Sequence, residues 1–256
     1  MKIRSFGAAA KIGFVLLLAQ GVAAEAAEVK VIAGAAMSGV IGELGPQFER
    51  TTGHKLVIQY GLAPALKRQI EAGEAFDLVI LSRAPMDDLT KQGKIAAGTR
   101  AEIAQVCMGV AVRAGAPKPD IGSVEAFKRA LLNASSITYT ADSTTGIHLA
   151  KVFERLGIAE PMKAKAKPQQ VPLRTPQAVA DGEAELGIAL TNILLSVRGV
   201  EHVGLLPPEL QNCLVFSAGV GAAAKQPDAA KALIKHLTAP AAAVVIKAKG
   251  MEPATP

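Results

Sequence analysis

Residues 29–60 read VKVIAGAAMSGVIGELGPQFERTTGHKLVIQY, and the rest of the chain builds on the unit that they form. They begin with a short apolar, β-branched run that ends in the small residues Ala33 to Ser38, which is typical of a buried strand. Apolar residues then recur at helical spacing until Gly53, and Lys55 to Gln59 has the pattern of a second strand. The stretch therefore predicts a βαβ unit. Its first loop leads into a helix N-terminus, where free backbone N–H groups favour an anionic or polar ligand.

Residues 1–24 have the pattern of a cleavable secretory signal. The apolar core, Ile12 to Leu18, is too short for a stable membrane span, and Val22-Ala23-Ala24 is a small-residue cleavage site, with Ala26 and Ala27 as alternatives. The charged residues before the cleavage site are all basic: Lys2, Arg4 and Lys11. The alternative is an uncleaved N-terminal anchor. We expect export by cleavage and no stable membrane insertion of the mature chain, because no later apolar run approaches membrane-spanning length.

The charge balance gives no sign of a polyanionic partner. The 256-residue chain has 28 Lys and Arg against 22 Asp and Glu, and loss of the predicted signal leaves 25 against 22, a net charge of +3. Basic residues are not interleaved with aromatic ones, Trp is absent and only two Tyr occur, so we expect no nucleic-acid binding. The mature length of about 230 residues suits two modest lobes or one large domain.

Two cysteines, Cys107 and Cys213, lie far apart in the sequence, each in an apolar, strand-like run. In an oxidising compartment they pair if those strands are neighbours; otherwise each is a small buried apolar residue. Both interpretations are open, and we favour the second. Neither cysteine has the spacing of a metal motif, and the four histidines are widely spaced, so we expect no metal site and no cofactor.

Strand and helix patterns alternate after Tyr60, which predicts an α/β fold with mostly parallel sheets. The predicted strands cover residues 77–81, 107–113, 137–140, 186–190 and 214–220. The predicted helices cover residues 64–71, 86–92, a segment after Ser123, 146–156, a segment that ends at 179–183, 227–237 and 240–249. Residues 82–85 and 142–145 are predicted as loops.

A turn-rich link from Ala114 to Pro119 suggests a change of lobe. We expect lobe 1 to contain residues 25–105 and 216–256, and lobe 2 to contain residues 106–215. Ligands of open α/β sheets lie beyond the carboxyl ends of the strands, so two facing lobes form a cleft that closes about a hinge.

Four segments resemble the periplasmic molybdate-binding proteins of ABC transporters. They are AEVKVIAGAAMS at 27–38, KRQIEAGEAFDLVI at 67–80, ADGEAELGI at 180–188 and VIKAKGMEP at 245–253. The resemblance covers nearly the whole mature chain. It implies the two-lobed class II periplasmic binding protein fold, with mixed sheets and an interlobe cleft. It also implies a periplasmic, monomeric solute-binding protein of an ABC importer, which captures a small anion and delivers it to a membrane subunit.

The loops after the predicted strands supply the candidate ligand-binding residues. They are Ala36, Met37, Ser38, Gly61, Leu62, Ala63, Arg83, Ser143, Thr144, Thr145, Thr191 and Asn192. Caps and surface ion pairs are the alternative roles for the Ser, Thr and Arg members of this set. The second loop has no Ser or Thr, and Ala189-Leu190-Thr191-Asn192 lacks the tyrosine that the family has after this strand. These departures favour a small organic acid over molybdate.

The scaffold also resembles aconitate isomerase, a periplasmic enzyme related to these binding proteins. Isomerisation of aconitate needs a general base and cations for the carboxylates. His148 and Tyr60 are the candidates for proton transfer, and Arg83 or Arg174 for a bidentate carboxylate clamp. His148 fits ordinary packing as well, and a solvated position is the alternative for Arg174. Because no base stands out, a receptor is the favoured interpretation and the isomerase is the alternative.

Overall fold

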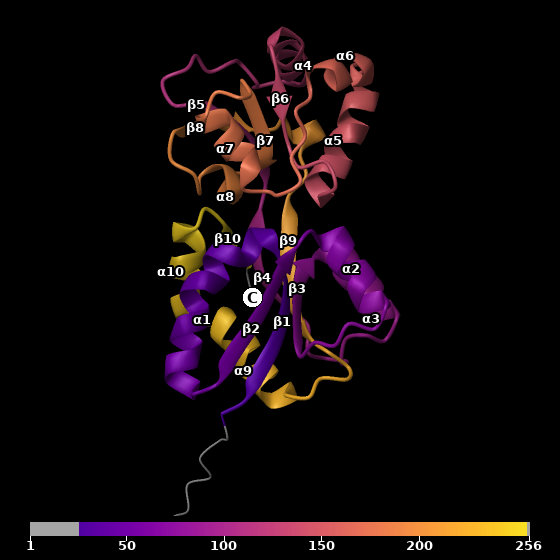
Figure 1. Ribbon diagram of the computed structural model, residues 1–256, viewed down its shortest axis with the longest axis vertical. Helices are drawn as coiled ribbons and strands as arrows, with labels where there is room; N and C mark the ends of the chain where they lie inside the picture. The colour runs from indigo at the N-terminus through magenta and orange to yellow at the C-terminus, as the bar shows by residue number, and fades with distance from the viewer. Residues whose placement is uncertain (1–25, 255–256) are drawn as a thin grey trace, which may run out of the picture.

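The computed structural model describes residues 26–254, so the predicted signal at 1–24 lies outside the described residues. The described chain forms two lobes stacked along the long axis of the molecule, each built on its own β-sheet (Figure 1). We call the part on the six-stranded sheet lobe 1 and the part on the four-stranded sheet lobe 2. The fold is the two-lobed α/β arrangement that the sequence predicts.

Lobe 1 has the strand order β10-β4-β9-β3-β1-β2. Its strands are β1 (Glu28–Gly34), β2 (Lys55–Gly61), β3 (Leu78–Ser82), β4 (Ala101–Val106), β9 (Leu214–Val220) and β10 (Glu252–Pro253). Its helices are the 3-10 turn η1 (Ala35–Met37), α1 (Ser38–Thr52), α2 (Ala63–Glu71), α3 (Arg83–Lys91), α9 (Pro227–Leu237) and α10 (Pro240–Ala248). β1 pairs in parallel with β2 and β3, so these strands end together at the edge that faces lobe 2 (Figure 1).

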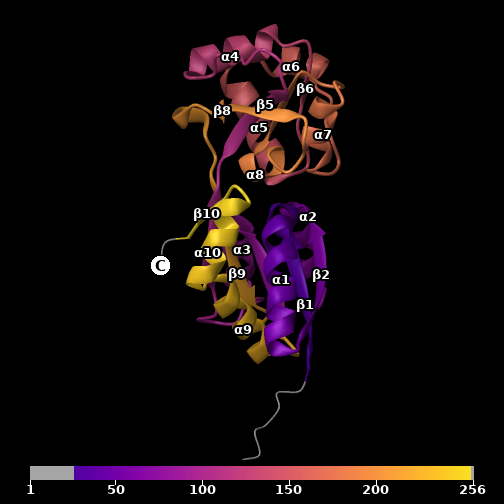
Figure 2. The ribbon, with the colours of Figure 1, turned by 90° about the vertical axis from the view of Figure 1, so that its left-hand side faces the viewer.

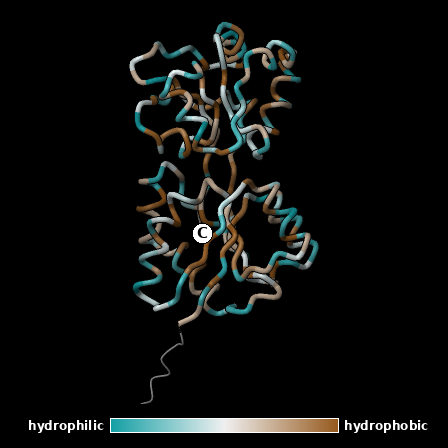
Figure 3. Tube along the Cα trace, viewed as in Figure 1, coloured by the Kyte–Doolittle hydropathy of each residue, from teal (hydrophilic) through white to brown (hydrophobic). Residues whose placement is uncertain are grey.

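The period-2 pattern of the lobe 1 strands explains its three layers. Alternate residues of β1 and β3 face opposite sides of the sheet: Val31 and Ile80 pack in the core that includes α1, α9 and α10, whereas Ile32 and Val79 pack with α2 and α3. Figure 2 shows α1, α9 and α10 together in the face turned toward the viewer. Apolar residues concentrate along the central strands and polar ones along the outer helical surfaces (Figure 3).

Lobe 2 has the strand order β6-β7-β5-β8. Its strands are β5 (Met108–Arg113), β6 (Ile137–Thr138), β7 (Leu186–Leu190) and β8 (Val200–Leu205). Its helices are α4 (Val124–Asn133), α5 (Thr144–Arg155), α6 (Ala159–Lys165), α7 (Arg174–Ala180), α8 (Thr191–Leu194) and the 3-10 turn η2 (Pro208–Leu210). β6 and β7 are parallel, and the turns after them point back toward lobe 1 (Figure 1).

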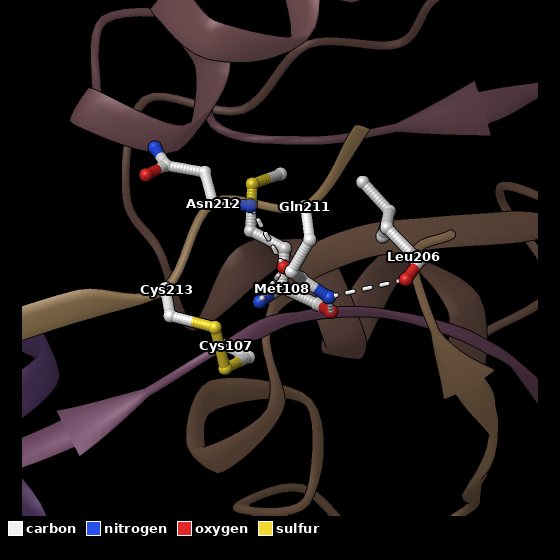
Figure 4. Close-up of a disulfide and its surroundings, with 6 residues drawn as sticks. All are labelled: Cys107, Met108, Leu206, Gln211, Asn212 and Cys213. Atoms are coloured by element: carbon white, nitrogen blue, oxygen red, sulfur yellow. Dashed lines mark hydrogen bonds between the residues drawn. A yellow bond between two sulfur atoms is a disulfide. The ribbon is translucent and has the colours of Figure 1, made fainter. Parts of the chain in front are cut away.

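The chain crosses between the sheets twice, once after β4 and once before β9, and Cys107 and Cys213 form a disulfide at these crossings (Figure 4). The preference for two separate buried cysteines is therefore wrong. Val106 pairs with Leu214, so the two crossing segments are neighbours. Beside the bridge, the Gln211 side chain accepts from Met108 N at 2.9 Å and donates to Met108 O at 3.0 Å.

The expectation of mostly parallel sheets is wrong, because three strand pairings are parallel and five are antiparallel. The difference arises because β9, β4 and β10 join the lobe 1 sheet by antiparallel pairing, and β5 pairs antiparallel with both β7 and β8 in lobe 2. Two predicted loops are also helical in part: α3 begins at Arg83, within 82–85, and α5 begins at Thr144, within 142–145. The lobe limits at residues 105/106 and 215/216 stay a prediction.

Within residues 26–254 no single helix has both the length and the apolar composition of a membrane span. The helices α9 and α10 meet these two criteria only when they are taken together, and the pair is bent by 66°. The same part of the chain brings together no group of three or more His, Cys, Asp or Glu side chains suited to a metal ion.

Candidate ligand-binding cleft

A cleft with about 510 Å³ of unfilled space, part of it open to solvent, lies between the two lobes at the carboxyl ends of β1, β2 and β3. We call its lobe 1 side the lobe 1 wall; it contains Gly34, Ala35, Ala36, Gly61, Leu62, Ala63, Ser82, Leu214 and Phe216. The facing side is the lobe 2 wall; it contains Thr140, Ser143, Thr144, Thr145, Pro172, Ala189, Leu190 and Ile193.

Parallel register brings the loops of the lobe 1 wall together. Gly34 of β1 lies opposite Gly61 of β2, so η1 and α2 begin side by side. A Cβ on Gly61 would lie 2.9 Å from Leu66 Cδ2, so glycine here lets Leu66 pack beneath the wall. Pro64 and Pro85 have no N–H, and Ala65 N donates to Leu62 O, so the first turns of α2 and α3 leave the N–H groups of Ala63, Arg83 and Ala84 at this edge, where they favour negative charge.

Ser82 is the one hydroxyl-bearing residue of the lobe 1 wall. It ends β3 and is 3 % exposed. It occupies the N-cap position of α3, but its side chain makes no capping hydrogen bond. Among residues 26–254, Ser82 Oγ has no hydrogen-bond partner. Ser82 is not among the predicted site residues, although it lies in the predicted loop 82–85 beside the candidate Arg83.

The hydroxyl groups of the lobe 2 wall mostly bond to one another. Thr140 Oγ1 lies 3.1 Å from Thr175 Oγ1, and both side chains are buried. Ser143 Oγ caps α5: it donates to Thr140 O at 2.7 Å and accepts from Gly146 N at 3.0 Å. Thr145 Oγ1 lies 2.9 Å from Ser143 Oγ. These bonds fix the loop from 140 to 146, which carries the wall.

Two further features complete this loop. A Cβ on Gly146 would clash with the carbonyl oxygens of Thr140 and Ala141, so the close approach of the backbone requires glycine. Thr144, the first residue of α5, also lines the cleft, and it is half-buried. Unlike its neighbours, its hydroxyl takes part in none of the side-chain hydrogen bonds of residues 26–254.

Titratable side chains are absent from the described lining, which contains no Asp, Glu, His, Lys, Arg or Tyr. His148 Nε2 lies 2.9 Å from Leu210 O within lobe 2. Tyr60 lies beside the lobe 1 wall, is 39 % exposed and has a pKa raised by partial burial. Arg83 and Arg174 are exposed and form ion pairs with Glu102 and Glu183 respectively. Within the described lining itself, positive charge comes from helix N-termini.

The structure brings seven of the predicted site residues onto the lining: Ala36, Gly61, Leu62, Ala63, Ser143, Thr144 and Thr145. The other five lie off the lining: Met37, Ser38, Arg83, Thr191 and Asn192. Met37 is fully buried, and Ser38 is the first residue of α1. Asn192 is nevertheless close to the cleft, since its Nδ2 donates to Ala36 O of lobe 1 at 2.8 Å. The binding role of the whole set stays a prediction.

Residues 29–252 match the family model described as bacterial extracellular solute-binding protein, and the chain belongs to that family. It is 34 % identical over 230 residues to an aconitate isomerase from a Pseudomonas species, with 87 % of each chain covered. It is 31 % identical over 240 residues to the molybdate-binding protein ModA of Azotobacter vinelandii, which covers 89 % of this chain and 91 % of ModA. The resemblance to the molybdate-binding proteins is thereby confirmed.

The solved structures agree on the fold. The periplasmic molybdate-binding protein of Azotobacter vinelandii superposes with a TM-score of 0.72 at 20 % identity, covering 89 % of this chain and 99 % of that one. The tungstate-binding protein TupA of Desulfovibrio alaskensis gives a TM-score of 0.66 at 16 % identity, covering 90 % and 100 %. At these identities the likeness shows a shared fold.

Proposed function

We propose that the protein is the periplasmic receptor of an ABC importer and that it captures a small organic di- or tricarboxylate in the interlobe cleft. The observation that carries the proposal is the composition of the lining. Hydroxyl groups and helix N-termini offer donors to carboxylate oxygens, and no titratable side chain in the described lining offers acid–base chemistry. Family membership supports the receptor role.

The apolar part of the lining favours carboxylates over inorganic oxyanions. Leu62, Leu190, Ile193, Leu214 and Phe216 cover much of the wall between the donors. A tetrahedral oxyanion presents oxygen in every direction, and an oxygen turned toward such side chains loses its hydration without a replacement donor. A carboxylic acid with a carbon skeleton places its oxygens at the donors and its carbon atoms against the apolar residues.

Aconitate isomerase activity is the second candidate, and the 34 % identical relative of that name favours it. The described lining supplies no general base for it. Tyr60 is the nearest candidate, because it immediately precedes Gly61 of the lobe 1 wall, but its raised pKa disfavours the phenolate. His148 bonds to Leu210 O within lobe 2. A receptor needs only binding and closure, whereas an isomerase must also move a proton.

Isothermal titration calorimetry on the mature protein tests the proposal with trans-aconitate, cis-aconitate, citrate and molybdate. We expect binding of at least one carboxylate and weaker or no binding of molybdate. Tight molybdate binding with no response to the organic acids would contradict the proposed ligand class.

Ultraviolet absorbance separates the two candidates, because cis- and trans-aconitate differ in spectrum. We expect no approach to isomer equilibrium when either isomer is incubated with the protein. Turnover that disappears in Tyr60→Phe or His148→Ala, with the fold intact, would establish the isomerase instead.

Export through a cleaved signal is part of the proposal and has its own measurement. Mass spectrometry of the periplasmic fraction should find a new N-terminus between Glu25 and Glu28. A cytoplasmic protein with Met1 intact would remove both the periplasmic location and the transporter partner.

A further inference from the structure

We propose that Ser82 is a ligand-contacting, specificity-determining residue, and that its hydroxyl and the hydroxyl of Thr144 bind the anion from opposite walls of the cleft. The inference rests on the proposed function and names two contacts within it. The observations that carry it are the burial of Ser82, its missing partner and the way in which the other hydroxyls of the cleft are used.

Ser82 lines the cleft, and its hydroxyl is buried without a hydrogen-bond partner in the described chain. A buried hydroxyl that loses water without gaining a partner destabilises the folded state. Such groups are rare in native proteins, and each calls for an explanation such as a functional role or a bound water. A ligand oxygen in the cleft would supply the missing partner.

Its place in the fold suits a negatively charged partner. Ser82 stands at the N-cap of α3, yet the side chain does not accept from the first N–H groups of that helix. An anion at this point therefore meets the hydroxyl together with the positive end of a nine-residue helix. The lining residue beside it, Phe216, pairs with Ser82 in the sheet and gives the ligand an apolar surface.

The remaining hydroxyls of the cleft are distinguished by their bonds. Thr140 is held by Thr175, and Ser143 and Thr145 are held by each other and by the backbone of their loop. Thr144 is the lining hydroxyl of lobe 2 that makes no side-chain hydrogen bond within residues 26–254. One uncommitted hydroxyl thus belongs to each wall.

A neighbouring cavity shows that these two residues lie on elements that face each other. It is lined by Ala84, Pro85 and Asp88 of α3, by Pro64 and Lys67 of α2, and by Thr144 and Ile147 of α5. The first turns of α3 and α5 therefore approach across the cleft, which brings the helix that follows Ser82 opposite Thr144. A ligand that bonds to both hydroxyls links the two lobes.

The test uses the mature, full-length protein and trans-aconitate as the probe, with citrate as a second probe. Ser82→Ala should raise the dissociation constant roughly 10- to 100-fold, as expected for loss of a hydrogen bond to a charged group. The melting temperature of the ligand-free variant should equal or exceed that of the wild type, because the substitution removes an unpartnered buried hydroxyl. Thr144→Val should weaken binding in the same direction.

Ser217→Ala is the matched control. Ser217 is a fully buried serine on the adjacent strand β9, off the lining, with Arg100 Nη2 3.5 Å from its Oγ. It should leave the dissociation constant unchanged.

The outcomes separate the two claims. If the wild type binds neither probe, the proposed ligand class fails and this inference fails with it. If the wild type binds and Ser82→Ala binds equally well, only this inference is overturned. A ligand-free Ser82→Ala variant that melts well below the wild type would show that the hydroxyl already has a structural partner, which also overturns it.

Discussion

The two walls of the cleft differ in how most of their hydroxyl groups are used. On the lobe 2 wall, Thr140, Ser143 and Thr145 bond to one another, to Thr175 and to the backbone of their own loop. On the lobe 1 wall, Ser82 is buried and has no partner in the described chain. Polar groups that form hydrogen bonds stabilise a loop. A buried polar group without a partner destabilises the folded state, and a ligand that bonds to it removes this penalty. The comparison indicates that three of the four hydroxyls of the lobe 2 wall hold its loop in shape and Thr144 alone is uncommitted, whereas the single hydroxyl of the lobe 1 wall has no structural partner.

The disulfide gives the largest expected difference between the walls. It closes a loop with a sequence separation of 106 residues, which contains the residues of the lobe 2 wall and none of those of the lobe 1 wall. Replacing both Cys107 and Cys213 by Ala should lower the free energy of unfolding by about 2–5 kcal/mol. Amide hydrogen exchange should then rise more in lobe 2 than in lobe 1. If hydrogen exchange rose equally in the two lobes, or did not rise, the disulfide would not restrain lobe 2 more than lobe 1.

A pair of glycine substitutions compares the walls directly. Gly146→Ala places a Cβ against backbone carbonyls of the lobe 2 wall and should cost about 1–3 kcal/mol of folding free energy, with weaker ligand binding. Gly61→Ala on the lobe 1 wall meets only the end of the Leu66 side chain, which can move, so it should cost less. Chemical denaturation measures both. The reverse order would show that the lobe 2 loop is not held rigidly.

Thr175→Val removes the partner of a buried hydroxyl and leaves Thr140 Oγ1 unsatisfied. We expect a loss of about 1–3 kcal/mol in the free energy of unfolding. Ser82→Ala, in the same denaturation assay, should cost nothing. If both variants lose stability equally, the contrast between the walls does not hold.

The smallest expected effect is the pH dependence of stability that His202 contributes in lobe 2. His202 on β8 of lobe 2 has a pKa lowered by burial, and its Nε2 is buried without a partner among residues 26–254. The unfolded chain therefore binds this proton more readily, so stability is present above the unfolded pKa and is lost as pH falls below it. We expect the melting temperature to fall between pH 7 and pH 5, and to fall less in His202→Gln. An unchanged slope in that variant would remove His202 as the cause.

Most of the fold could be predicted from local patterns. The β1–α1–β2 unit, the strands β3, β7 and β9, and the two C-terminal helices all have clear apolar periodicity or glycine and proline boundaries. The missed elements lack such signals. β4 has a mixed burial pattern, β8 is half-buried along most of its length, and β10 is only two residues long. Without β4, the neighbourhood of Cys107 and Cys213 was not visible in the sequence.

The loops that form the candidate site could be predicted from the sequence, but the contacts of the individual residues in them could not. Fold analogy placed Gly61–Ala63 and Ser143–Thr145 at the cleft, and the structure puts them on its lining. It could not show that Ser143 is committed to capping or that Ser82 lacks a partner, because both facts depend on tertiary neighbours. Arg83 followed a buried strand, as a carboxylate clamp would, but it pairs with Glu102 instead.

A crystal structure of the mature protein grown with trans-aconitate tests the central claim most directly. The account predicts ligand density in the interlobe cleft, with carboxylate oxygens within hydrogen-bond distance of Ser82 Oγ and Thr144 Oγ1 and with carbon atoms against Phe216. The bonds of Thr140 to Thr175 and of Ser143 to Gly146 should stay unchanged. A cleft without ligand at saturating concentration, or a ligand held by Arg83 or His148 rather than Ser82, would contradict it.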